Sequence, residues 1–153
     1  MKYLVVYFSA SGITKETGER LKTKLNCDSY EIKPKVKYSD KDLNWMDKNS
    51  RSSVEMKDKT SRPEIIKEEL DVSKYDCILL GFPIWWYTAP TIINTFLESY
   101  NLDNKEIILW ATSGGSGLGK AKNDLAKSTK ASIKDGKLLN SVKDIDSFVS
   151  ELK

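Results

Sequence analysis

Residues 3–14 read YLVVYFSASGIT, and this stretch decides the fold. Its first half is an unbroken run of aliphatic and aromatic residues, as expected of a strand buried on both faces. Its second half changes to serine and glycine and opens an amphipathic stretch. The apolar face of that stretch recurs every fourth residue, at Ile13, Thr17, Leu21 and Leu25. A buried strand, a glycine turn and a helix predict the first βα unit of a parallel sheet.

The same alternation continues along the chain. Further strands are expected at 29–32, 77–82 and 106–111 and within 131–139. Three later helices are predicted from apolar stripes: Ile92, Ile93, Phe96, Leu97 and Tyr100; Leu118, Ala121 and Leu125; and Val142, Ile145, Phe148, Val149 and Leu152. Pro90 is expected in the first turn of one helix, and Ser141 with Asp144 resembles a capping pair for the last. Strands joined by helices imply right-handed crossovers and a mostly parallel sheet of the α/β class. The length suits one domain, residues 1–153.

Residues 33–62 interrupt this pattern. They hold nine basic and five acidic residues and few apolar anchors. We expect a long surface excursion with a short helix near residues 40–48. An excursion of this length in a compact domain is either functional or mobile.

The composition excludes several classes of catalytic and binding site. The 153 residues include no histidine, and the two cysteines, Cys27 and Cys77, form no CxxC pattern and are expected to be reduced. A Ser-His-Asp arrangement is excluded, and any redox chemistry needs a bound organic cofactor. The net charge of +3 is too small to indicate nucleic-acid binding. The apolar runs are too short for a membrane span or a signal peptide, so a cytoplasmic location is expected.

Two unusual loops follow the first two strong strands, at the edge where parallel sheets bind ligands. Residues 9–14, SASGIT, bring hydroxyl groups to a helix N-terminus, which suits a phosphate group. The alternative is that Ser11 or Thr14 only caps the helix. Residues 81–90, GFPIWWYTAP, crowd three aromatic side chains together, which suits a flat ring. The alternative is a hydrophobic plug.

A third loop, TSGGSGLG at residues 112–119, follows the next strong strand. Its four glycines allow the backbone to approach a ligand closely; the alternative is a flexible turn. A phosphate site, a ring site and a source of backbone hydrogen bonds together describe a mononucleotide with a planar head.

With these motifs the chain resembles the flavodoxins, most closely flavodoxin-like bacterial proteins with GFPIWW and TSGGSG loops. The resemblance implies a doubly wound, five-stranded parallel sheet of order 2-1-3-4-5 and noncovalently bound flavin mononucleotide (FMN). By position it implies a phosphate site at Ser9, Ser11, Gly12, Ile13 and Thr14. It implies a ring site at Pro83, Ile84, Trp85, Trp86 and Tyr87. It implies contacts to the ring edge or ribityl chain from Ser113, Gly114, Gly115 and Gly117.

The chain departs from the best-known flavodoxins in three ways. Ile13 stands where asparagine is usual, the 112–119 loop has no aromatic residue, and the net charge is positive where long-chain flavodoxins are acidic. The side chain expected to stack on the ring is Trp86 or Trp85, with Trp86 favoured because alternation from Ile84 turns it to the same side.

Three functions remain open. The first is an electron carrier that serves larger redox partner proteins. The second is an FMN oxidoreductase that uses NAD(P)H or a quinone, since one ring face lacks an aromatic cover. The third is a binding module without redox use, which three intact ligand loops disfavour.

Overall fold

The computed structural model describes residues 1–112 and 117–152. Its centre is a parallel sheet of order β2-β1-β3-β4-β5. The strands are β1 (Tyr3–Phe8), β2 (Asp28–Ile32), β3 (Cys77–Pro83), β4 (Glu106–Thr112) and β5 (Ser132–Leu138). The predicted α/β class, the 2-1-3-4-5 order and each predicted strand are confirmed. The reversal of strand order lies between β1 and β3, where doubly wound sheets bind ligands.

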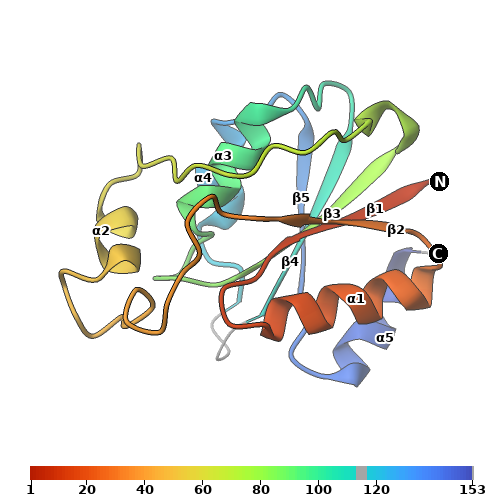
Figure 1. The fold of residues 1–153 in the computed structure, drawn as a ribbon. Coiled ribbons are helices and arrows are strands. Elements are labelled where there is room, and N and C mark those ends of the chain that lie inside the picture. Colours follow the sequence, from red (N-terminus) through yellow and green to blue (C-terminus); the bar gives the residue numbers. More distant parts are fainter. Residues whose placement is uncertain (113–116, 153) are drawn as a thin grey trace.

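Helices cover both faces of the sheet (Figure 1). The helices α1 (Ile13–Leu25) and α5 (Val142–Leu152) pack on one face. The other face carries α3 (Thr91–Ser99) and α4 (Ala121–Ala126). A short 3₁₀ helix, Val72–Lys74, precedes β3. The helix α2 (Arg51–Lys57) stands away from both faces, beyond the carboxyl ends of the strands (Figure 1). No helix in the described part of the chain is long and apolar enough to cross a bilayer.

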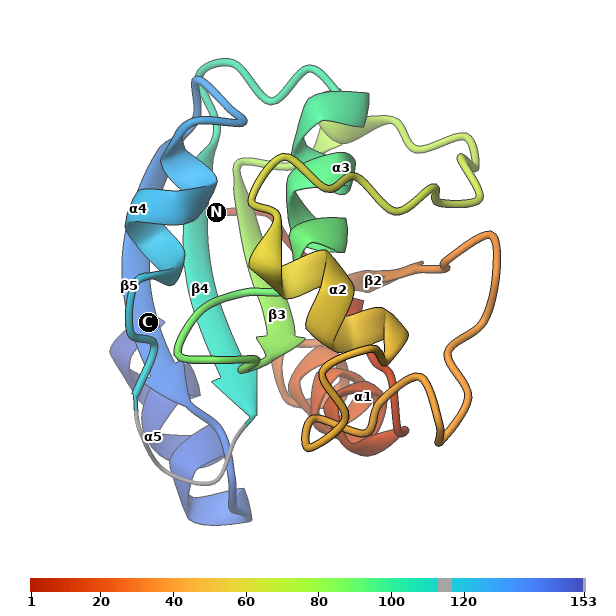
Figure 2. The ribbon, with the colours of Figure 1, turned by 90° about the vertical axis from the view of Figure 1, so that its left-hand side faces the viewer.

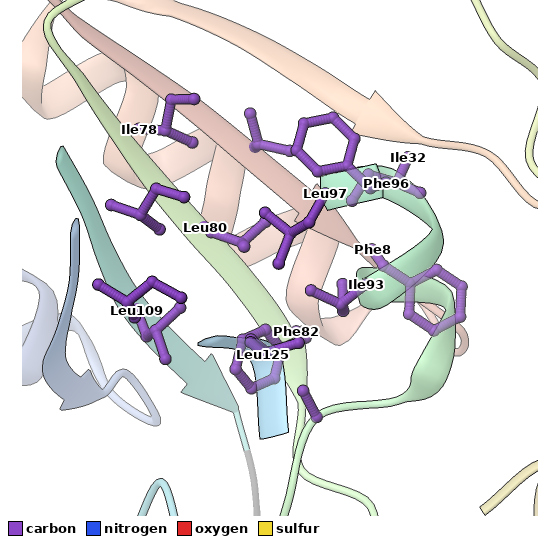
Figure 3. Close-up of a cluster of buried hydrophobic side chains, with 14 of the residues drawn as sticks. Phe8, Ile32, Ile78, Leu80, Phe82, Ile93, Phe96, Leu97, Leu109 and Leu125 are labelled. Carbon is purple, nitrogen blue, oxygen red and sulfur yellow. The ribbon is translucent and has the colours of Figure 1, made fainter. Parts of the chain in front are cut away.

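The core consists of two hydrophobic clusters, one on each face of the sheet. The larger cluster brings Phe8, Leu80 and Phe82 against Phe96 of α3 and Leu125 of α4 (Figure 3). The smaller one packs Trp110 and alternate residues of β1 and β3 against α1 and α5. Trp110 is fully buried and donates its indole N–H to the carbonyl oxygen of Leu79 at 3.0 Å. Its ring fills the space where a side chain at position 81 would project, so only glycine fits there.

Some predicted helix faces are wrong in detail. Ile13 is 64% exposed, and the buried stripe of α1 is Thr14, Thr17, Gly18 and Leu21. A spacing of four advances about 40° beyond a full turn at each step, so residues 13 and 25 cannot share a face. At the start of α5, Val142 is likewise exposed. Pro90 precedes α3 as its N-cap residue, and α4 begins only at Ala121, after Leu118. The Ser141 cap is confirmed: its hydroxyl accepts the N–H of Asp144 at 3.1 Å.

The helix predicted near residues 40–48 is also wrong, because that segment forms turns and the helix of the excursion is α2. Short polar side chains explain the difference. Asp42, Asn44 and Asp47 each accept a nearby backbone N–H, which competes with helix formation. The helix instead begins after Ser50, whose hydroxyl accepts the N–H of Ser53.

Candidate functional site

The β1–α1 loop presents hydrogen-bond donors at the edge of the sheet. Gly12 has φ +97°, in the left-handed region that favours glycine, and its N–H donates to the hydroxyl of Ser9 at 3.1 Å. The next three N–H groups open α1 and have no acceptor among the described residues. Ser11 is exposed beside them. This set of donors at the positive end of a helix is suited to a phosphate group.

The predicted phosphate residues do not all present their side chains. Thr14 is buried, and its hydroxyl lies 2.8 Å from that of Thr112, at the end of β4. The side chain of Ile13 points into solvent. These two residues therefore offer backbone N–H groups to a ligand, whereas the hydroxyls of Ser9 and Ser11 lie on the loop itself.

The β3–α3 loop folds into a tight turn with aromatic residues at its tip. Trp85 and Thr88 exchange two backbone hydrogen bonds, of 2.9 and 3.1 Å. The central residues, Trp86 and Tyr87, have φ +48° and +64°. Both side chains are exposed, Trp86 by 44% and Tyr87 by 67%.

This turn is strained. Two consecutive residues with positive φ are typical of turns that use Asn-Gly, and bulky side chains rarely adopt that conformation. Each such residue costs about 1–3 kcal/mol, and strain of this kind gathers at functional sites. The turn holds two aromatic rings at the ligand edge of the sheet despite that cost.

Trp85 has a different role. It packs edge-on against Phe8 and Tyr38, with ring centroids 5.9 and 5.6 Å apart, and it lies against the larger core cluster. Each tryptophan therefore matches one of the two roles that the sequence left open, a hydrophobic plug or an outward-facing ring. Trp85 plugs the core, and Trp86 faces outward with Tyr87. Pro83 ends β3, and Ile84 donates its N–H to the carbonyl oxygen of Thr112 at 2.9 Å.

The third loop is joined to the aromatic turn. Lys120 donates its N–H to the carbonyl oxygen of Tyr87 at 2.9 Å. Gly119 has φ +55°, and a Cβ there would overlap that same carbonyl. Gly117 has φ +76° and open space around it. Of the other predicted ring-edge residues, Ser113, Gly114 and Gly115 lie outside the described residues. The sequence signal for Gly119 was only that a fourth glycine follows the motif.

The excursion returns to the same end of the sheet. Figure 2 views the molecule from the side of the carboxyl ends of the strands and shows α2 in front, between α3 and α1. Arg51 pairs with Glu55 at 3.0 Å and stacks 3.8 Å above the ring of Tyr38. The hydroxyl of Tyr38 donates to Glu55 at 2.5 Å. Burial, followed by this bond to Glu55, raises the pKa of Tyr38. No local pattern in the sequence predicted this cluster, because its members are up to 17 residues apart.

A small pocket opens between the excursion and the aromatic turn. Its volume is about 180 Å³, and its walls are Trp45, Lys48, Ser53, Met56, Lys57 and Trp86. In the described part of the chain, no cluster of three cysteine, aspartate or glutamate side chains is arranged to hold a metal ion. Both cysteines are free thiols.

Comparison with known proteins decides the family. The flavodoxin family model matches residues 2–152. The chain belongs to the flavodoxin family. Among curated proteins none matches it.

Solved structures resemble this flavodoxin over nearly its whole length. A protein from Bacteroides eggerthii DSM 20697, assigned as a flavoprotein, is 42% identical with TM-score 0.90, covering 98% of this chain and 96% of its own. A second, from Bacteroides uniformis ATCC 8492, is 41% identical with TM-score 0.89, covering 97% of each chain. A flavoprotein from Lactobacillus acidophilus NCFM, solved in complex with FMN, shares the fold at 22% identity and TM-score 0.70, covering 97% of this chain and 98% of its own.

Proposed function

We propose that this flavodoxin binds FMN and uses it to transfer electrons. The observation that carries the proposal is the strained aromatic turn at the same edge of the sheet as the open start of α1. One offers ring faces at the ligand edge of the sheet, and the other offers unpaired N–H groups for a phosphate. The solved complex of a protein of this fold with FMN supports the same ligand.

The residues present fit FMN. The backbone N–H groups of Ile13 and Thr14 and the hydroxyls of Ser9 and Ser11 bind the phosphate without a cation. Gly12 leaves open space there, since a Cβ at its position would have no neighbour within 4 Å. Gly117 is equally open, so its backbone can approach the ring edge or the ribityl chain. Ser113, Gly114 and Gly115 are proposed as its companions by their position in the chain.

Trp86 is the side chain proposed to stack on the ring. It stands at the tip of the turn and is exposed, whereas Trp85 is held in place by Phe8 and Tyr38. Pro83, Ile84 and Tyr87 border the same site from the strand end and the turn. FMN, when bound, supplies the electron-accepting chemistry, and the protein contributes binding, orientation and the polarity around the ring.

A carrier exchanges electrons with a separate redox partner protein. The net charge of +3 indicates that the partner surface is not strongly basic. With a basic partner, electron transfer should become faster as salt screens the repulsion. An oxidoreductase acting on a small molecule is the second candidate, and the pocket beside Trp86 favours it.

Binding and transfer are tested separately. The purified protein should take up FMN from solution and bind riboflavin more weakly, because riboflavin lacks the phosphate. Failure to bind either flavin overturns the proposal. FMN-loaded protein is then mixed with NADH or NADPH alone. Slow bleaching of the flavin absorbance supports a carrier, and fast bleaching at turnover rates supports an oxidoreductase.

A further inference from the structure

The pocket between the excursion and the aromatic turn combines two kinds of wall. Trp45 and Trp86 supply aromatic surface, and Met56 adds a polarizable apolar side chain. Trp45 is 69% exposed, an unusual position for a large ring that contributes nothing to the core. Exposed apolar surface gathered at one place marks an interaction site.

The pocket is also positively charged. Lys48 and Lys57 line it, and no carboxylate of the described residues does. Neither lysine forms an ion pair with a carboxylate of the described residues, whereas Lys33, Lys35 and Lys59 of the same excursion each do. Two uncompensated ammonium groups beside aromatic walls are complementary to a ligand that is both flat and anionic.

The pocket walls are held in place by contacts outside the pocket. Arg51 and Glu55 tie α2 to Tyr38, and the Tyr38 ring packs against Trp85 at the base of the turn. Within the pocket wall, Lys57 donates to the carbonyl oxygen of Lys48 at 3.2 Å, which joins α2 to the turns before it. A pocket built this way is largely formed before a ligand arrives, which reduces the entropy lost on binding.

We propose that this pocket binds a small planar aromatic anion beside the flavin, with the aromatic part between Trp45 and Trp86 and the anionic group near Lys48 and Lys57. The volume of about 180 Å³ suits a small aromatic group, since a cavity of about 150 Å³ holds one benzene ring. The position of this ligand beside the flavin rests on the proposed function, because Trp86 serves both sites. Binding itself does not depend on it.

Calorimetric titration with two matched probes tests whether the pocket prefers an anionic ligand to a neutral one. Naphthalene-2-sulfonate carries the negative charge, and naphthalene-2-sulfonamide is its neutral isostere. Both are titrated into FMN-loaded and FMN-free protein. We expect the sulfonate to bind both forms, about tenfold tighter than the sulfonamide. Equal affinities for the two probes overturn the assignment of an anion.

Two variants test the walls. Trp45→Ala should weaken both probes by about tenfold. The double variant Lys48→Gln/Lys57→Gln should weaken the sulfonate about fivefold and leave the sulfonamide unchanged. The matched controls, Met46→Ala and Lys41→Gln, alter exposed side chains of the excursion that do not line the pocket, and they should bind like the parent. Circular dichroism checks that each variant is folded.

The FMN-loaded arm separates this proposal from the proposed function. If FMN does not bind at all, the proposed function fails and the FMN-free titration still decides the pocket. If the sulfonate binds only FMN-free protein and FMN displaces it, the pocket is part of the flavin site and the proposal is overturned. Absence of binding to either form overturns it as well.

Discussion

The hydroxyl of Thr14, in the first turn of α1, lies 2.8 Å from the hydroxyl of Thr112, the last residue of β4. The two residues are 98 positions apart, and both are buried. The bond joins the loop proposed to hold the phosphate to the strand that leads into the glycine-rich loop. It therefore links two parts of the candidate flavin site through the core.

Removing one partner of this bond should destabilise the protein. Thr14→Val and Thr112→Val each leave a buried hydroxyl without its partner, which should lower the free energy of unfolding by about 1–3 kcal/mol. The double variant removes both hydroxyls and should lose less than the sum of the two. Urea unfolding of all four proteins measures the coupling. Strict additivity would show that the bond contributes nothing.

Ser11→Ala should discriminate between two flavins. A hydrogen bond to a charged group contributes about 1.5–3 kcal/mol, so the loss of the hydroxyl should weaken FMN binding at least about tenfold. Riboflavin lacks the phosphate and should be affected far less. Fluorescence titration with both flavins gives the comparison. An equal loss for FMN and riboflavin would mean that the loop does not contact the phosphate.

Gly119→Ala and Gly117→Ala form a matched pair. Both glycines have positive φ, so each alanine carries the backbone cost of about 1–2 kcal/mol. Only at position 119 does the new Cβ also overlap the carbonyl oxygen of Tyr87, which should displace the aromatic turn. We therefore expect Gly119→Ala to lower stability further and to weaken FMN binding more than Gly117→Ala does. Indistinguishable variants in thermal unfolding would contradict the link between the two loops.

Trp86→Gly should separate stability from function. Glycine adopts positive φ without strain, so the flavin-free variant should gain about 0.5–1 kcal/mol in unfolding free energy. FMN should bind it more weakly, and the bound flavin should fluoresce more brightly, because the stacked ring is gone. Trp85→Ala should instead lower the free energy of unfolding by about 2–4 kcal/mol, because it removes packing against the core. A destabilised Trp86→Gly variant with unchanged FMN affinity would make that residue structural.

Alkaline stability should depend on Cys77. Burial, and then the nearby carboxylate of Glu106, raise the pKa of this thiol to about 12. In the unfolded chain the thiol has a pKa of about 8.5. Because the pKa is higher in the folded state, the contribution of the protonated thiol to the free energy of unfolding is complete below about pH 8.5. This contribution is lost as the pH rises toward 12. Urea unfolding at pH 7, 9 and 10.5 should show a steeper decline for the parent than for Cys77→Ala. Parallel declines would exclude this thiol as a source.

Much of the fold could be predicted because it is encoded in short stretches. The buried run of β1 and the glycine turn after it are local patterns, and they place a βα unit whatever the rest of the chain does. Once the strands alternate with helices, crossover handedness leaves few arrangements. The carboxyl ends of β1, β3 and β4 then meet at one edge, which is why three separate motifs could be assigned to one site.

Other features depend on contacts between distant residues and left no local signal. Trp85 packs inward and Trp86 points outward because of the tight turn and the core partners Phe8 and Tyr38. Alternation along the loop does not explain the difference. The position of α2 was missed because the side chains of 40–48 bond their own backbone and Ser50 starts the helix later. Local patterning by itself thus determined the strands and the loops proposed to form the site, and the strand order followed from the family resemblance. Tertiary packing alone decided which side chains face the ligand edge, because burial and strain are set by neighbours that the sequence keeps far apart.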